Sequence, residues 1–215
     1  MKFIKPGENF EFRSRMQIIG SNKYNKGKQF IVDPMWPDKI EGEVDTAGVD
    51  EGSALLLTGL VAAIKPNFIF ETGTHKGRST RALADGVTEN GFGQILTVDA
   101  KDFGFLSGNA LTNHQKQFVT QVIGPCPGIL KETIFQSVEK IDLAYLDGGH
   151  TRDVLEPELQ YVLDRTHGHC VVVVDNSVDD FWHEIRETMD DWKKVHNCVT
   201  LPTMCGFDIM TFFEE

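Results

Sequence analysis

Residues 142–150 read Asp-Leu-Ala-Tyr-Leu-Asp-Gly-Gly-His, and the rest of the chain is interpreted against this stretch. Its apolar residues predict a buried strand that stops at Asp147, turns on two glycines and presents His150. The apolar run at residues 171–174 stops in the same way, at the Asp-Asn pair 175–176. Two apolar strands that end in hard oxygen ligands indicate a divalent-cation site at one edge of a sheet.

A third apolar strand, residues 68–70, runs into the loop ETGTHKGRS at residues 71–79. Gly73 allows a tight turn beside a ligand, and Gly77 opens a helix whose free amides suit a carboxylate. Asp99 follows one strand–helix–strand unit later, where an acid can accept both hydroxyls of a ribose. We predict that this loop and Asp99 bind a cofactor. The alternative is an ordinary strand-to-helix turn with a surface acid.

Strands alternate with helical stripes from residue 50 to the end of the chain. This alternation predicts a doubly wound, Rossmann-like α/β sheet of seven strands, mostly parallel with one antiparallel C-terminal strand. Glu71, Asp99, Asp147 and Asp175 all follow predicted strands. They should share the carboxyl edge of the sheet, where such folds bind ligands. The predicted strands are 68–71, 94–98, 117–123, 141–146, 170–174, 195–201 and 207–213; the predicted helices include 50–64, 76–87, 152–163 and 179–193.

Residues 1–48 show no lasting period and are punctuated by glycine and proline. We predict an N-terminal extension or cap over 1–48 and a single main domain over 49–215. The alternative for the first segment is a flexible tail, although its scattered phenylalanines and isoleucines offer apolar anchors.

The formal net charge is −11, which argues against nucleic acid as the main partner because phosphate binding depends on clustered Lys and Arg. The four cysteines, at 126, 170, 198 and 205, show neither CxxC nor zinc-like spacing, so buried free thiols are expected. The N-terminus lacks a signal-peptide core, and no apolar run reaches the roughly 18 residues of a membrane span. We therefore expect a cytoplasmic protein without a membrane partner.

These motifs together resemble the class I S-adenosylmethionine-dependent methyltransferases. The matching segments are 71–79, 97–99, 142–150, 171–176 and 206–209, and the resemblance covers roughly residues 50–215. It implies that Glu71 and Gly73 flank the methionine part of S-adenosylmethionine, that Ser79 and nearby amides take its carboxylate, and that Asp99 takes the ribose. The cofactor-binding residues implied in this way are Glu71, Gly73, Thr74, Gly77, Ser79, Asp99, Asp147 and, beside the adenine, Cys126.

Within that class, the chain looks most like the metal-dependent O-methyltransferases of the catechol type and their sugar and macrolide relatives. The resemblance implies that Asp147, Asp175 and Asn176 hold Mg²⁺ or another divalent cation. Oxygen ligands with positions left open for substrate are also what magnesium chemistry requires. The plainer alternative for residues 175–176 is a helix cap after a strand.

His150 lies three residues after Asp147, where the catechol-type enzymes carry a lysine base. Histidine can replace that base because its ordinary pKa of about 6.5 suits proton transfer near neutrality. The alternative is a structural histidine that caps the next helix. Gly148 and Gly149 also lack the side chains that contact adenine in catechol-type enzymes, which puts a catechol substrate in doubt.

The sequence thus predicts an S-adenosylmethionine-dependent, metal-assisted O-methyltransferase that acts on a hydroxyl of a small molecule. Two alternatives stay open at this point. One is a relative of the cephalosporin-hydroxylase type with other chemistry, and the other is a non-catalytic cofactor-binding protein. The substrate and any homo-oligomeric state are not specified by these motifs.

Overall fold

The computed structural model of the protein describes residues 48–213, except positions 107, 109, 179 and 204. The predicted extension over residues 1–48 therefore lies almost wholly outside the described residues, and its role as a cap stays a prediction.

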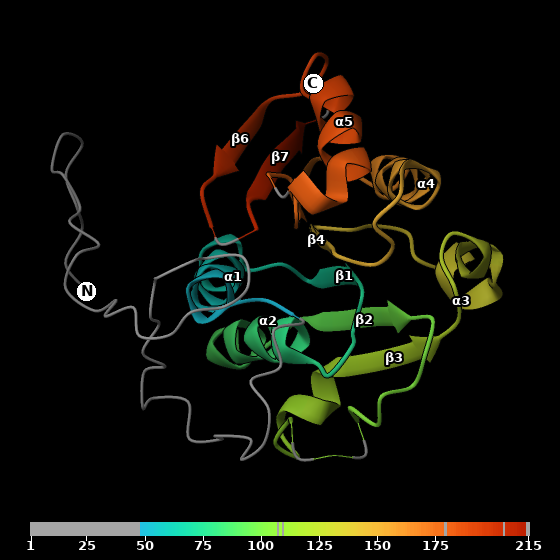
Figure 1. The fold of residues 1–215 in the computed structure, drawn as a ribbon. Helices are drawn as coiled ribbons and strands as arrows, with labels where there is room; N and C mark the ends of the chain where they lie inside the picture. The colour runs from blue at the N-terminus through green and yellow to red at the C-terminus, as the bar shows by residue number, and fades with distance from the viewer. Residues whose placement is uncertain (1–47, 107, 109, 179, 204, 214–215) are drawn as a thin grey trace, which may run out of the picture. The chain divides into compact units, whose positions relative to one another are not determined.

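The fold is built on one seven-stranded sheet with the strand order β3-β2-β1-β4-β5-β7-β6 (Figure 1). Strands β1 to β5 run parallel, and β7 runs antiparallel to both of its neighbours, β5 and β6. The prediction of a mostly parallel α/β sheet with an antiparallel C-terminal strand is confirmed. The strands are β1 (Phe68–Thr72), β2 (Gln94–Asp99), β3 (Val119–Ile123), β4 (Leu143–Leu146), β5 (His169–Val174), β6 (Cys198–Leu201) and β7 (Phe207–Phe213).

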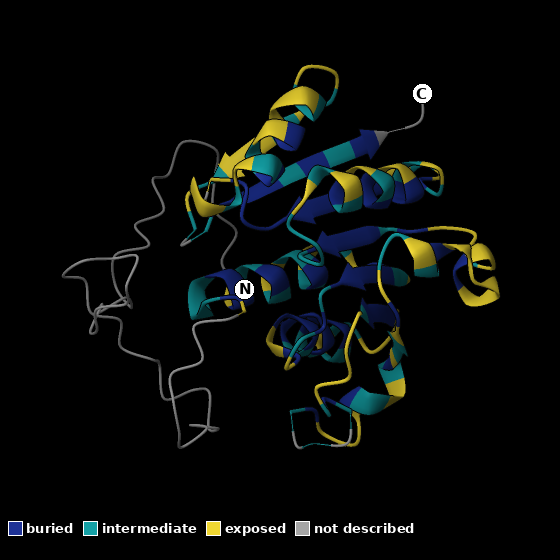
Figure 2. Ribbon diagram, turned by 45° about the vertical axis from the view of Figure 1, so that its right-hand side comes forward, coloured by how far each residue is buried: buried dark blue, intermediate teal, exposed yellow. Residues whose placement is uncertain are grey.

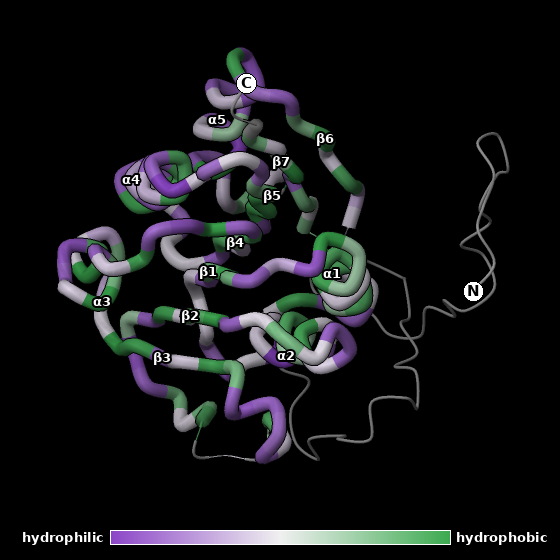
Figure 3. Tube along the Cα trace, turned by 180° about the vertical axis from the view of Figure 1, so that it is seen from behind, coloured by the Kyte–Doolittle hydropathy of each residue, from purple (hydrophilic) through white to green (hydrophobic). Residues whose placement is uncertain are grey.

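Helices cover both faces of the sheet, as Figures 1 and 3 show from opposite sides. One face carries α1 (Glu51–Ile64) and α2 (Arg78–Asn90), which pack against each other. The other face carries α3 (Thr133–Gln136), α4 (Arg152–Leu163) and α5 (His183–Trp192). Three short 3₁₀ helices complete the connections: η2 (Gln115–Phe118), η3 (Gly128–Lys131) and η4 (Asp180–Trp182).

The core consists of the strands and the inward sides of these helices (Figure 2). All four residues of β4 are buried, as expected for a parallel strand covered on both faces. Phe70 on β1 packs against Phe135 and Tyr161, with ring centroids 6.3 and 5.1 Å away. Burial of one such aromatic or aliphatic side chain contributes about 1.5–3 kcal/mol to the stability of the fold. This packed core supports the carboxyl edge of the sheet.

Two helices begin later than predicted. The helix predicted from Lys76 begins at Arg78, because Gly77 has φ +80° and this left-handed conformation cannot belong to a right-handed helix. The helix predicted over 179–193 is divided into η4 and α5, and Trp182 between them has a non-helical backbone. Both differences occur in loops at the carboxyl edge of the sheet.

All four cysteines are free thiols, as predicted, but only Cys170 is fully buried. Within residues 48–213 no helix combines the length and apolarity needed to cross a membrane.

Candidate active site

The carboxyl ends of β1, β4 and β5 bring the predicted site residues side by side. Thr72 pairs with Leu146, and Leu146 pairs with Val174. The next residues along these strands, Gly73, Asp147 and Asp175, are therefore neighbours at one edge of the sheet. The backbone N–H of Asp147 donates to the carbonyl of Thr72 at 3.1 Å, which fixes this alignment.

Gly73 turns the chain where no side chain fits. Its φ is +86°, and its N–H donates to the carbonyl of Val98 at 2.8 Å. A Cβ atom at this position would lie 2.2 Å from the carbonyl oxygen of Asp147. The glycine therefore lets the predicted cofactor loop approach the backbone of the predicted metal ligand.

Replacing Gly73 with alanine should reduce the free energy of unfolding by about 3 kcal/mol or more, because a left-handed conformation and a backbone collision add together. Gly91→Ala is the matched control, since Gly91 has φ +76° and nothing within 4 Å of an added Cβ. It should cost only about 1 kcal/mol. Urea unfolding measures both values, and equal losses would show that the collision at Gly73 is relieved without cost.

Glu71 is completely buried at the end of β1, on the face covered by α2. Its two carboxyl oxygens accept hydrogen bonds from the hydroxyls of Ser79 and Thr80, each at 2.6 Å. Burial raises the pKa of this carboxyl to about 7, although the two hydroxyls oppose the shift. Glu71 thus connects β1 to the first turn of α2, and the Ser79 hydroxyl, predicted to meet the cofactor carboxylate, donates to Glu71 in this structure.

The other residues of the predicted cofactor site surround the same loop. Thr74 is buried and its hydroxyl lies 2.6 Å from that of Thr97. The backbone of Gly77 lies against the ring of Phe105, where an added Cβ would have no room. Asp99 accepts backbone N–H groups on both carboxyl oxygens, from His75 at 2.7 Å and from Lys101 at 2.9 Å. The Asp99 side chain is therefore held in one orientation at the edge of the sheet.

The two predicted carboxylate ligands share a tyrosine hydroxyl. Tyr145 Oη donates to Asp175 Oδ2 at 2.7 Å and lies 3.5 Å from Asp147 Oδ2. Asn176 has φ +63°, a left-handed conformation that asparagine tolerates better than most residues, and its N–H donates to Asp175 Oδ1 at 2.6 Å. The Asn176 side-chain amide donates to Asp147 Oδ1 at 2.9 Å.

Two carboxyl groups and an amide meet at this point, and such groups offer the oxygen atoms that divalent cations prefer. Burial, and then the nearby Asp147 carboxylate, raise the pKa of Asp175 well above its usual range. No positively charged side chain offsets these two causes, so the negative charge of the two carboxylates is not neutralised by the protein. A rotation of the Asn176 amide would present its oxygen in place of its nitrogen. No cluster of three or more His, Cys, Asp or Glu side chains within the described residues is arranged to hold a metal. The predicted set has only two carboxylates, with an amide as its third member.

His150 lies directly beside the predicted metal ligands. Its Nε2 is 3.1 Å from the amide nitrogen of Asn176 and 3.4 Å from Asp147 Oδ1. The other side of the imidazole stacks on Trp182 of η4, with ring centroids 4.2 Å apart and an interplanar angle of 29°. Contacts on both sides therefore hold the ring in place, while its side chain stays 27% exposed.

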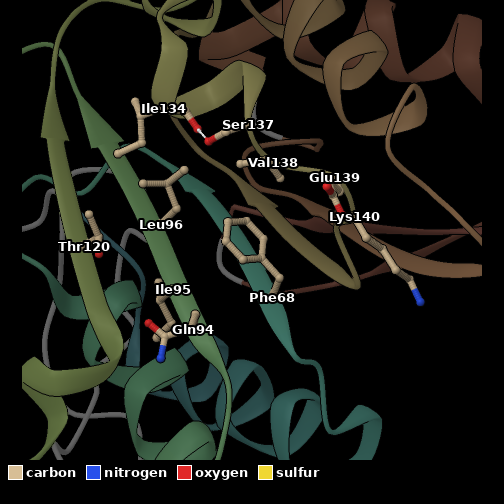
Figure 4. Close-up of a pocket in the computed structure, with 10 residues that line it drawn as sticks. All are labelled: Phe68, Gln94, Ile95, Leu96, Thr120, Ile134, Ser137, Val138, Glu139 and Lys140. Atoms are coloured by element: carbon tan, nitrogen blue, oxygen red, sulfur yellow. Dashed lines mark hydrogen bonds between the residues drawn. The ribbon is translucent and has the colours of Figure 1, made fainter.

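Cys126, the last predicted cofactor residue, follows β3 and is half-buried. Its thiol lies against the carboxyl of Glu158 on α4, and burial, followed by that carboxyl, raises the pKa of the thiol. A hollow of about 440 Å³ elsewhere lies toward the amino ends of the strands, beside Phe68 and Gln94 (Figure 4). Its position separates it from the carboxyl edge that gathers the predicted residues.

Sequence reasoning missed two residues of this site, Tyr145 and Glu158. Tyr145 precedes Asp147 by two residues, and side chains two apart on a strand share a face. Glu158 lies between Leu155 and Val162 on the apolar stripe of α4, where a carboxyl is unusual. The spacing of two residues along the strand and the helical spacing on α4 are the sequence patterns that indicate Tyr145 and Glu158.

Comparison with known proteins agrees with this geometry. The profile of a methyltransferase domain family matches residues 70–177, half of the chain. An O-methyltransferase from Bacillus cereus in complex with S-adenosylhomocysteine has 17% identity and a TM-score of 0.61, over 79% of this chain and 84% of that one. TomG, an O-methyltransferase of tomaymycin synthesis from Streptomyces achromogenes solved with S-adenosylmethionine, has 20% identity and a TM-score of 0.59, over 76% and 79%.

The methyltransferase MTH1 of Podospora anserina, solved with S-adenosylhomocysteine, has 15% identity and a TM-score of 0.62, over 78% of this chain and 80% of that one. A comparison with curated protein sequences gave no match. The predicted resemblance to class I methyltransferases is confirmed by the family match and by the shared fold. The chain belongs to the methyltransferase domain family and has the fold of S-adenosylmethionine-dependent O-methyltransferases.

Proposed function

We propose that this protein transfers the methyl group of S-adenosylmethionine to a hydroxyl group of a small molecule, with help from a divalent cation. The observation that carries the proposal is the position of His150. A base for the hydroxyl proton, two carboxylates and an amide meet at one point on the carboxyl edge of the sheet.

The loop after β1 and the Asp99 carboxylate would hold the cofactor. Gly73 lets the loop pack directly against the backbone of Asp147, so that the two would form one wall for the methionine part, and Asp99 is fixed by two backbone amides in an orientation suited to the ribose hydroxyls. Glu71 supports this loop from below through Ser79 and Thr80. The residues Thr74, Gly77 and Cys126 would complete the cofactor wall.

Asp147, Asp175 and Asn176 would hold Mg²⁺ or a similar cation, whose charge lowers the pKa of a nearby hydroxyl. Tyr145 orients Asp175, and its pKa, raised well above its usual range mainly by burial, keeps it a neutral donor. The chain would thus supply two carboxylates and, after rotation of the Asn176 amide, one amide oxygen beside the acceptor hydroxyl.

His150 would take the proton of that hydroxyl at Nε2. In this structure the Asn176 amide nitrogen lies 3.1 Å from Nε2, and it would have to turn aside, as it would to present its oxygen to a cation, before Nε2 takes that proton. As the proton leaves, the acceptor oxygen would bond to the methyl carbon while the bond from that carbon to sulfur breaks, with neutral S-adenosylhomocysteine as the leaving group. Stacking on Trp182 keeps the imidazole aligned during the transfer.

The test is methyl transfer by His150→Gln. Turnover on an accepted hydroxyl substrate should fall by about a hundredfold, because glutamine fills the site but cannot take a proton. Cofactor affinity, measured by calorimetry, should change by less than about twofold, since His150 acts on the acceptor. His169→Gln is the matched control, because His169 is exposed at the amino end of β5. Unchanged turnover in His150→Gln would remove His150 from the mechanism.

A further inference from the structure

Glu158 is a buried acid with one oxygen left unused. It lies on α4 and is 1% exposed. The hydroxyl of Thr72 donates to its Oε2 at 3.1 Å, whereas Oε1 is buried and has no hydrogen-bond partner among the described residues. An unpaired buried polar atom of this kind costs about 1–3 kcal/mol, so it calls for an explanation.

The carboxyl of Glu158 touches the ends of three strands. Thr72 ends β1. A Cβ atom on Gly148, just after β4, would lie 3.0 Å from Oε1, so the absence of a side chain there leaves room for the acid. The thiol of Cys126, after β3, lies against the same carboxyl, to which it can offer only the weak hydrogen bond of an S–H group. The unused oxygen is thus located just beneath the loops that form the cofactor edge.

Glu71 provides a contrast on the opposite face of β1. It is buried to the same degree, but hydroxyl groups satisfy both of its oxygens. Both oxygens of the Glu71 carboxyl accept hydrogen bonds, whereas only one oxygen of the Glu158 carboxyl, Oε2, accepts one. The difference points to a hydrogen-bond donor that arrives with a ligand.

The segment after β3 makes the identity of that donor more specific. Residues 124–127 read Gly-Pro-Cys-Pro, which offers neither a carboxylate nor an amide side chain to a purine. On the proposed function, on which this step rests, the adenine of the cofactor lies beside Cys126 and carries a 6-amino group that donates two hydrogen bonds. In either charge state, a carboxyl group keeps an oxygen that accepts.

We propose that Glu158 accepts a hydrogen bond from the 6-amino group of the cofactor adenine, while the Cys126 thiol turns aside. Glu158 is then the side chain that selects adenine, at a site where residues 124–127 carry no carboxylate or amide side chain to do so. The free protein bears the cost of an unpaired buried oxygen. Binding of the cofactor would remove that cost, and its removal would add to the binding free energy.

The experiment compares two ligands by calorimetry: S-adenosylhomocysteine and its 6-deamino analogue, which lacks only the amino group. The natural ligand should bind the wild-type protein about tenfold more tightly, as expected for one buried hydrogen bond. Glu158→Met should bind both ligands equally. Glu158→Gln should keep the preference, because the amide oxygen can face the amino group while its nitrogen faces Thr72.

Glu156→Met is the matched control, since Glu156 is exposed on the same helix and should leave the preference unchanged. Equal affinities of the wild-type protein for the two ligands would overturn the role of Glu158 without any variant, even if Glu158→Met fails to fold. An unchanged preference in Glu158→Met would do the same. Failure of the wild-type protein to bind either ligand would instead overturn the proposed function, and this inference with it.

Discussion

Replacing Asp175 with asparagine should lower metal-dependent methyl transfer at least about a hundredfold, because one of only two carboxylates around the proposed cation is lost. The replacement changes almost no volume. An asparagine oxygen can accept from the N–H of Asn176, and its nitrogen can donate to Tyr145, so both observed partners of Asp175 stay satisfied. The loss therefore reports on charge, and initial rates with Mg²⁺ or with a chelator measure it.

The same variant should be more stable than the wild-type protein when a chelator is present. Asp175 is buried beside Asp147, and both burial and that neighbour disfavour its charged form. Added Mg²⁺ should raise the melting temperature of the wild-type protein and leave that of Asp175→Asn unchanged. Asp191→Asn is the control and should be less stable than the wild-type protein. Asp191 is exposed, and its pKa is lowered, mainly by the hydrogen bond from Lys194. Retention of metal-dependent turnover in Asp175→Asn would contradict the proposed metal site.

The strand ends could be predicted from the sequence because they depend on local patterns. Apolar runs followed by Glu71, Asp147 and Asp175 predict buried strands that stop at acids, and parallel packing then places those acids at one edge. The order of the strands does not follow from this alternation alone, because the same alternation fits other doubly wound sheets and closed barrels. Two of the differences, at Gly77 and Trp182, come from single residues with non-helical backbones, which periodicity does not reveal.

Contacts between distant segments were not predictable in this way. Tyr145 on β4 contacts Asp175 at the end of the neighbouring strand β5. Glu158 contacts Thr72 from helix α4, which lies far from β1 in the sequence. The sequence also suggested that Ser79 faces the cofactor, whereas its hydroxyl donates to Glu71 in this structure. A hydroxyl has several rotamers and partners within reach, so packing decides which one it meets. The roles of these residues toward ligands stay predictions.

The cofactor-free, metal-free protein should lose stability as the pH rises from about 4.5 to 8. Glu71 and Glu158 are both buried, and burial raises their pKa values from 4.5 to about 7 and about 8. The folded state therefore binds more protons than the unfolded state between these values. Stability from such a group is complete below the unfolded pKa and is lost as the pH rises through the folded pKa. The combined loss from these two acids should be about 7 kcal/mol.

Single substitutions separate the two contributions. Glu71→Gln should remove the part of the slope that ends near pH 7, and Glu158→Gln the part that ends near pH 8, because an amide does not titrate. Chemical unfolding at intervals between pH 4.5 and 8.5, with a chelator present, measures the slope. Glu156→Gln should leave it unchanged because that side chain is exposed. A wild-type protein that becomes more stable over this range would mean that the two acids are ionised in the folded state.

Occupancy of the cofactor site should then reduce the part of the slope that belongs to Glu158. On the inference above, the 6-amino group of adenine donates to Oε1, and a donor favours the ionised form of a carboxyl. Saturating S-adenosylhomocysteine should therefore stabilise the protein more at pH 8 than at pH 6, and Glu158→Gln should lose most of that difference. Glu71 provides the internal comparison, because its oxygens are already satisfied by Ser79 and Thr80 and lie on the opposite face of β1. A pH difference that disappears in Glu71→Gln but persists in Glu158→Gln would assign the coupling to the methionine side of the cofactor and not to its adenine.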